Sequence, residues 1–294
     1  MSSSNTPQGH QIETPRLPPE LECIIFELAA TLKGTSFTLL LVAKRVYEWI
    51  YPTLFTVLQL DSSPVARRIK ELLEPTRNTN SDFPAHAVRR IAIPSTALFE
   101  QVIRACHNLT HIALYNDANI GVYTMHAIVA LPRLQYLATV STIWSRLLAV
   151  PLPASGPAFP SLTHLDLLHF RSSRSSWLYI PWTIALPALT HLALLTENLS
   201  SSDPEWAALL PCPTLRALIL LPALSSDTTF LDRVAPHVSD PRLVLFRSAP
   251  GSWLDTIIPS EDGLPTMWER ADEFLQAKRE GRVAKDCFVV PEET

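Results

Sequence analysis

A leucine pattern that recurs along the chain constrains its fold more than any other feature. The pattern P-x-L-x-x-L-x-L is complete at three places, and weaker copies lie on both sides of them. The first leucines of the copies stand at positions 109, 134, 162, 189, 215 and 243, in steps of 25, 28, 27, 26 and 28 residues. Such self-similarity indicates a solenoid, in which each repeat packs on its neighbours. The copies are Val88–Ile93, Asn108–Leu114, Pro132–Thr139, Pro160–Leu167, Pro187–Leu194, Pro213–Leu220 and the degraded Pro241–Leu243.

Each copy is predicted to contain a β-strand, with an array of paired helices as the alternative. The proline before the first leucine lacks an N–H group and disfavours helical geometry in the residue that precedes it. Segments such as Leu165-Asp-Leu167 alternate apolar and variable residues, as a half-buried strand does. Paired-helix repeats also need roughly 33 residues or more. The chain thus resembles the leucine-rich-repeat proteins over about residues 54–250, and the resemblance implies an α/β solenoid of parallel strands with convex helices.

Helices are expected between the strand segments, and a first strand is expected at Thr53–Leu60. Ser63 and Pro64 start the first of these helices as an N-cap and a first-turn proline. The segments expected to be helical are 63–74, 95–106, 123–131, 203–210 and 227–238.

An apolar helical segment precedes the repeats. Apolar residues recur at helical spacing over residues 17–28, and Gly34 interrupts the chain after them. A second helix is expected from Ser36 to Val46 and a third over Tyr47–Tyr51. The plain interpretation of this segment is a helical cap on the solenoid.

The same segment resembles an F-box through Leu17-Pro-Pro-Glu-Leu21 and Leu39-Leu-Leu-Val42-Ala-Lys44-Arg45. It is particularly similar to the divergent F-box-like proteins of mushroom-forming fungi. The resemblance implies a three-helix module over residues 17–53 that docks onto the Skp-type adaptor of a cullin–RING ubiquitin ligase. The residues that it implies for adaptor binding are Leu17, Pro18, Leu21, Ile24, Ile25, Leu28, Leu39, Leu40 and Val42.

The two ends of the chain differ from the repeats. Residues 1–16 are polar and are expected to form a disordered tail without a secretory signal. Residues 251–294 lack the leucine pattern and are expected to cap the repeats. Thr266 and Glu269 form a predicted capping box that opens a helix, and Gly281 is expected to end it. A helix that closes the end of the repeats is preferred over a helix that binds a partner.

Composition excludes several classes of site. The seven glycines are too widely spaced for a phosphate-binding loop or a nucleophile elbow. Four cysteines without C-x-x-C spacing predict reduced side chains in a cytoplasmic or nuclear protein rather than a metal site. The net charge of −4 predicts no nucleic-acid partner, and no apolar stretch is long enough to predict a membrane span. We therefore expect no cofactor and no enzymatic activity.

The residues that flank the strand leucines are expected to form rows on the concave surface, because neighbouring strands lie about 4.8 Å apart. The row that contains Val140 and ends with Leu168, Leu195 and Leu221 is apolar, which is typical of an interaction site. The alternative is that insertions or the C-terminal segment cover this row. The residues expected to bind a target are Arg90, Tyr115, Tyr136, Val140, His164, Asp166, Leu168, His191 and Leu195.

His164, Asp166 and His191 fall on one face of adjacent predicted strands. The plain interpretation is a polar patch made by a repeated T-H-L motif, and a metal site or an acid–base group is the alternative. The preferred function is a non-enzymatic adaptor, whose helical module holds the ligase core and whose repeats recruit an unknown target protein. A ligase-independent scaffold and a metal-dependent enzyme are the alternatives.

Overall fold

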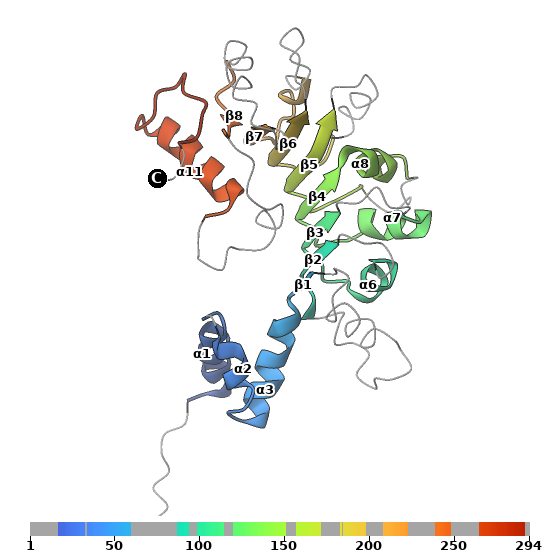
Figure 1. The fold of residues 1–294 in the computed structure, drawn as a ribbon, viewed down its shortest axis with the longest axis vertical. Helices are drawn as coiled ribbons and strands as arrows, with labels where there is room; N and C mark the ends of the chain where they lie inside the picture. Colours follow the sequence, from blue (N-terminus) through green and yellow to red (C-terminus); the bar gives the residue numbers. More distant parts are fainter. Residues whose placement is uncertain are drawn as a thin grey trace, which may run out of the picture. The chain divides into compact units, whose positions relative to one another are not determined.

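The computed structural model of the chain forms two compact units, Met1–Leu54 and Phe55–Thr294 (Figure 1). The expected tail at 1–16, the expected helices at 63–74 and 227–238, and most of the one at 203–210 lie outside the residues that the structure describes. No helix within the described ranges is long and apolar enough to cross a membrane. These ranges are 17–32, 34–59, 87–93, 99–114, 120–150, 157–171, 183, 185–197, 208–222, 239–247 and 265–291.

The first unit consists of three short helices and a closing 3₁₀ turn. Pro19 takes the first position of its helix, where the missing N–H group costs nothing, as the sequence predicts. Gly34 has a φ of +80°, a left-handed conformation that favours glycine, and it leads into the second helix. The elements are α1 (Pro19–Ala30), α2 (Thr35–Leu39), α3 (Lys44–Ile50) and the 3₁₀ helix η1 (Tyr51–Phe55).

The predicted helix from Ser36 to Val46 is wrong, because the chain leaves helical geometry between α2 and α3. Residues 40–42 form a turn and Ala43 is extended, with φ −162° and ψ 156°. The break starts a new helix in which Val46 and Ile50 point inward and become buried. An ion pair of 2.9 Å between the Arg45 guanidinium and Glu22 then joins α3 to α1.

The second unit contains an eight-stranded parallel sheet, so the α/β class is confirmed. The strands lie side by side in the order of the sequence, and each pairs with the one before it. The strands are β1 (Val57–Gln59), β2 (Arg90–Ile93), β3 (His111–Leu114), β4 (Tyr136–Val140), β5 (His164–Arg171), β6 (His191–Glu197), β7 (Ala217–Pro222) and β8 (Leu243–Leu245).

The strand register follows the leucine pattern. Leu165 of β5 pairs with Leu192 of β6, which pairs with Leu218 of β7, so the second leucine of each copy forms one row across the sheet. The last copy is an exception to the predicted alignment. Leu243 pairs with Leu218, so it stands at the second leucine position rather than the first.

Three helices cover one face of the sheet beside its first five strands (Figure 1). They are α6 (Phe99–Ala105), α7 (Val122–Val129) and α8 (Ser141–Leu148), of which the sequence predicts the first two. The prediction misses α8 because no turn residue separates it from β4, and Val140 is both the last strand residue and the helix N-cap. Their inner side chains join the strand leucines in one core.

The C-terminal segment forms a helix, α11 (Met267–Arg279), and then returns to the sheet. The predicted capping box is confirmed: the Glu269 N–H donates to Thr266 Oγ1 at 3.3 Å, and the Thr266 N–H donates to Glu269 Oε2 at 2.7 Å. Gly281, at φ +74°, ends the helix as predicted. Beyond it, Val289 bridges to Leu245, which lengthens the sheet beyond β8.

Replacing Trp144 by alanine is expected to destabilise the second unit by about 3–5 kcal/mol. The indole is 2% exposed, packs on Phe159 with ring centroids 5.4 Å apart, and donates from Nε1 to Thr183 Oγ1 at 3.2 Å. Denaturant unfolding of the full chain measures the change. Tyr123→Ala on α7 is the control, because that side chain is 80% exposed and its loss should cost about 0.5 kcal/mol or less. Equal effects of the two substitutions would contradict this placement of α8.

Candidate functional site

The face of the sheet opposite α6–α8 carries a row of stacked rings. His111, Tyr136, His164 and His191 occupy equivalent positions on β3 to β6, since each pairs with the next in the register. The ring centroids lie 4.1, 4.0 and 4.3 Å apart in that order, and neighbouring rings are within 14° of parallel. We call this row the aromatic ladder. It is built by parallel pairing, which brings together residues that are 25 or more positions apart.

The threonine before each histidine fixes the ring. The hydroxyls of Thr110, Thr163 and Thr190 each donate to a carbonyl oxygen of the preceding strand segment at 3.1 Å. Each hydroxyl also lies 2.8 Å from Nδ1 of the following histidine. A hydroxyl has one proton, and the carbonyl accepts it, so Nδ1 supplies the proton of the second bond. The repeated T-H-L motif therefore orients the ladder histidines, and each threonine hydroxyl accepts a proton from Nδ1 of the histidine that follows it.

Burial keeps two ladder histidines neutral. Desolvation, with a smaller effect from the positive charge of Arg90, lowers the pKa of His111 to about 3. Desolvation also lowers the pKa of His164 to about 3, with smaller effects from His191 and His111. Neutral rings stack without charge repulsion, so the continuous ladder depends on this burial.

The helix α11 lies against the ladder at its β5–β6 end. Trp268 meets the rings of His164 and His191 edge-on, with centroids 5.0 and 6.1 Å away. Asp272 Oδ1 lies 3.0 Å from His191 Nε2, the nitrogen opposite the one that contacts Thr190. Because Trp268 and Asp272 are four residues apart, both project from one side of α11. One helix turn thus attaches the C-terminal segment to two strands.

Asp166 is a buried carboxyl group on the same face. It lies on β5 between Ala138 and Ala193 of the neighbouring strands, and it is 2% exposed. Its Oδ1 has no hydrogen-bond partner among the described residues. Desolvation raises the pKa of Asp166 from 3.8 to about 7. A group with this pKa is largely protonated in mildly acidic solution and becomes a buried anion in mildly alkaline solution.

The predicted target-binding surface is wrong for five of its residues, because they are buried. Leu168 and Leu195 are 7% exposed and belong to the hydrophobic core. The helix α11 contacts this face at His164 and His191. Arg90, Tyr136 and His164 are half-buried, and Tyr115 lies outside the described residues. The five buried residues are Val140, Asp166, Leu168, His191 and Leu195.

The ladder does not resemble a metal centre. The His164 and His191 rings are parallel within 4°, and their Nδ1 atoms face threonine hydroxyls rather than a shared point. Among the described residues no group of three histidine, cysteine or acidic side chains is placed to hold a metal ion. Sequence reasoning found the histidines but not Trp268 and Asp272 as their partners, because contacts across 81 residues leave no local signal.

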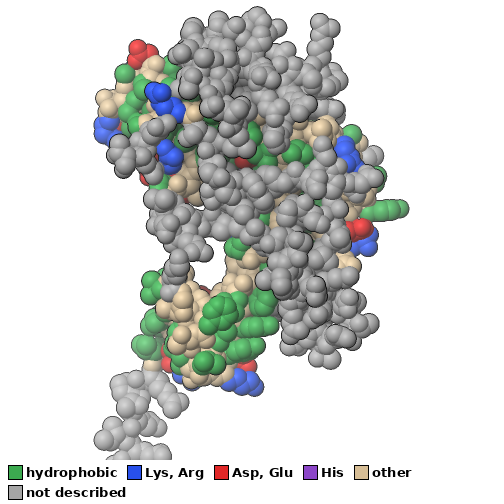
Figure 2. Space-filling view, viewed as in Figure 1, with side chains coloured by type: hydrophobic (Ala, Val, Ile, Leu, Met, Phe, Trp, Pro, Cys, Tyr) green, Lys and Arg blue, Asp and Glu red, His purple; other side chains and the backbone are tan. Residues whose placement is uncertain are grey.

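The helical unit presents most of its predicted adaptor-binding residues to solvent. Figure 2 shows hydrophobic side chains spread over the surface of α1–α3. Leu39 and Leu40, at the end of α2, are half-buried. The predicted adaptor-binding residues that are exposed are Leu17, Pro18, Leu21, Ile24, Ile25, Leu28 and Val42.

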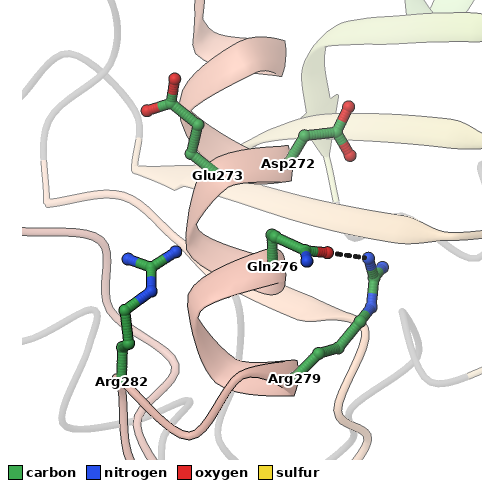
Figure 3. A pocket seen from close by; sticks show the side chains of 5 residues that line it. All are labelled: Asp272, Glu273, Gln276, Arg279 and Arg282. Carbon is green, nitrogen blue, oxygen red and sulfur yellow. Dashed lines mark hydrogen bonds between the residues drawn. The ribbon is translucent and has the colours of Figure 1, made fainter.

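Two surface hollows adjoin α11. One, of about 450 Å³, lies along α11 and has two carboxylates toward one end and two guanidinium groups toward the other (Figure 3). Its lining residues are Asp272, Glu273, Gln276, Arg279 and Arg282. The other, of about 410 Å³, adjoins the ends of β7 and β8 and is lined by Arg216, Pro241, Arg242, Leu275, Lys278, Arg279 and Lys285.

No protein-family model matches the chain, and no curated protein is detectably related to it in sequence.

Asp166→Asn is expected to stabilise the protein more at pH 8 than at pH 5. The folded-state pKa of Asp166 lies above the unfolded value of 3.8, so the folded state holds this proton more tightly. The resulting stability is fully present below about pH 4 and is lost as pH rises through 7. Between pH 5 and 8 the loss spans about two pKa units, or about 3 kcal/mol, and the asparagine variant escapes it.

Denaturant unfolding of wild type and variant at the two pH values measures this difference. The histidine contributions are common to both proteins and cancel in the comparison. Glu273→Gln, an exposed acid on α11, controls for the removal of one negative charge. A stability difference between Asp166→Asn and wild type that is independent of pH would show that Asp166 is not buried as described.

Proposed function

We propose that the chain is a non-enzymatic, substrate-recruiting adaptor of a Skp–cullin–F-box type ubiquitin ligase. In this proposal the helical unit is an F-box-like module that binds the Skp-type adaptor. The sheet unit is a leucine-rich-repeat domain that binds a target protein. The proposal rests on the sequence resemblance of residues 17–53 and on one structural observation of the helical unit.

That observation is the exposed apolar surface of the helical unit. The helix α1 has no buried side chain along its whole length. Large apolar residues are instead strongly exposed, among them Leu41 at 87%, Phe37 at 71% and Leu28 at 64%. Contiguous apolar surface of this kind on a small unit usually marks an interaction site. The exposed set is Leu17, Leu21, Ile24, Ile25, Leu28, Leu32, Phe37, Leu41, Val42 and Tyr47.

The free energy gained by burying this surface on binding is large enough for a stable complex. Burying one leucine or isoleucine side chain contributes ~1.5–3 kcal/mol, so a few such residues supply a large part of a binding free energy. The exposed residues of α1 recur at helical spacing, which favours a partner whose groove accepts the side of one helix.

The repeats supply the second part of the proposal. Parallel repeats in sequence order produce an extended surface, which such proteins use to bind other proteins. Because α11 covers part of the sheet, we assign the target to surfaces that stay accessible. Tyr136 is half-buried, whereas Val122 and Tyr123, at the start of α7, are exposed and apolar.

The double variant Ile24→Glu, Leu28→Glu is expected to lower affinity for the Skp-type adaptor at least about a hundredfold, because two buried apolar contacts of ~1.5–3 kcal/mol each are lost. Both side chains are exposed in the free chain, at 51% and 64%, so the helical unit should keep its fold. Calorimetric titration of purified full chain with the adaptor measures the affinity, and circular dichroism checks the fold.

Val122→Glu, Tyr123→Glu is the matched control, since it places the same charges on exposed apolar residues of the other unit. It should bind the adaptor like wild type. A wild-type chain that shows no binding with adaptor in excess would favour the ligase-independent scaffold, and the adaptor proposal would be abandoned.

A further inference from the structure

The hollow of about 410 Å³ beside the end of α11 is lined by positive side chains from separate parts of the chain. Arg216 directly precedes β7, and Arg242 directly precedes β8. Lys278 and Arg279 end α11, and Lys285 belongs to the segment that follows it. No acidic residue lines the hollow within the described part of the chain. Figure 2 shows lysine and arginine side chains near the α11 end of this unit.

Nearby carboxylates offset only part of this charge. Asp240 forms an ion pair with Arg242, in which Oδ2 lies 2.8 Å from Nη2. Arg242 also donates to the carbonyl oxygens of Leu210, Cys212 and Leu215. Asp286 acts on Lys278 at longer range. Arg216 and Lys285 are exposed and form no side-chain hydrogen bond or ion pair within the described residues. Their donors are therefore free for a ligand.

Besides the positive lining, the buried Lys278 ammonium group also indicates that the hollow binds a ligand. Its side chain is 6% exposed, and its Nζ has no hydrogen-bond partner among the described residues. The ammonium group lies 4.1 Å from the centre of the Phe288 ring and 5.7 Å from that of Phe274. Ring faces attract a cation but accept no conventional hydrogen bond. Burial accordingly lowers the pKa of Lys278, and a bound anion in the adjacent hollow would favour the charged ammonium.

We propose that this hollow binds the phosphate group of a phosphate monoester. A phosphate monoester has a charge of nearly −2 at neutral pH and three acceptor oxygens, so it can take hydrogen bonds from several cations together. A carboxylate has half that charge and two oxygens. Arginine recognises planar pairs of phosphate oxygens, and lysine adds a point charge, which matches Arg216 with Lys285. This proposal is independent of the adaptor function, because the hollow lies wholly within the second unit.

The test is titration of the purified full chain with phenyl phosphate and with a random-sequence phosphoserine peptide mixture, both at constant ionic strength. Wild type is expected to bind phosphate saturably. Arg216→Gln and Lys285→Gln should each weaken binding about tenfold, since a hydrogen bond between charged groups is lost. Arg282→Gln is the control: it removes the same charge close by, from a side chain that pairs with Glu280 and does not line this hollow.

The outcomes separate the sources of the phosphate. Equal binding of phenyl phosphate and the peptide mixture supports a small phosphate ester as the ligand, and much tighter peptide binding supports a phosphorylated side chain. Arg216 and Lys285 are exposed, so the single variants should unfold like wild type, which circular dichroism verifies. No saturable binding by wild type below about 10 mM ligand overturns the proposal. Unchanged binding by both folded variants also overturns it.

Discussion

The need to cover both faces of a parallel sheet determines the rest of the second unit. A parallel sheet is stable in water only where both faces are buried, because its strands are apolar on both sides. In β7 all six residues are buried, so neither face can be left to solvent. The helices α6, α7 and α8 cover one face beside the first strands. The other face needs a separate cover, and the C-terminal helix α11 provides it where Trp268 meets the ladder.

The aromatic ladder explains how the polar T-H-L motif can lie on a buried face of the sheet. A charged histidine at the start of β3 or β5 would oppose burial, but stacking and the Thr–His hydrogen bonds satisfy the neutral rings of His111 and His164. Only the last histidine, His191, meets a carboxylate, and that carboxylate belongs to the covering helix. Polarity is thus concentrated at the contact that fixes the position of α11. A specific polar contact of this kind selects one arrangement of two apolar surfaces.

The regular parts of the fold could be predicted from sequence, because their signals are local. The leucine spacing gives the strands and their order, and the Thr266–Glu269 box with Gly281 gives the limits of α11. The sequence does not reveal the break after α2, because an apolar run can either continue a helix or form a turn, and only packing decides between the two. The exposure predicted for Leu168 and Leu195 is also wrong, since both belong to the hydrophobic core. Strand periodicity distinguishes the two faces of a strand but does not show whether another part of the chain covers one of them.

The position of Leu243 illustrates a related limit. In a degraded copy, a single leucine fits either the first or the second place of the pattern, and the sequence favours the first because a proline stands two residues earlier. The register shows the second, since Leu243 pairs with Leu218. Hydrogen bonding to the previous strand fixes the alignment there, through the Leu218 N–H donating to the Arg242 carbonyl at 3.0 Å. Pairing therefore outweighs side-chain pattern where the repeat is weakest.

The helical unit differs from the sheet unit, because many of its large apolar side chains are exposed. A unit of about 50 residues buries too small a share of its surface to be strongly stable alone. Here Val46 and Ile50 are the only side chains of the described part, residues 17–32 and 34–54, that are fully buried. The Arg45–Glu22 pair is exposed, and such pairs contribute about 0–1 kcal/mol. The apolar side chains of α1 thus stabilise this unit little in the free chain. Under the proposed function, the free energy that these side chains do not supply in the free chain would be gained when the partner buries them.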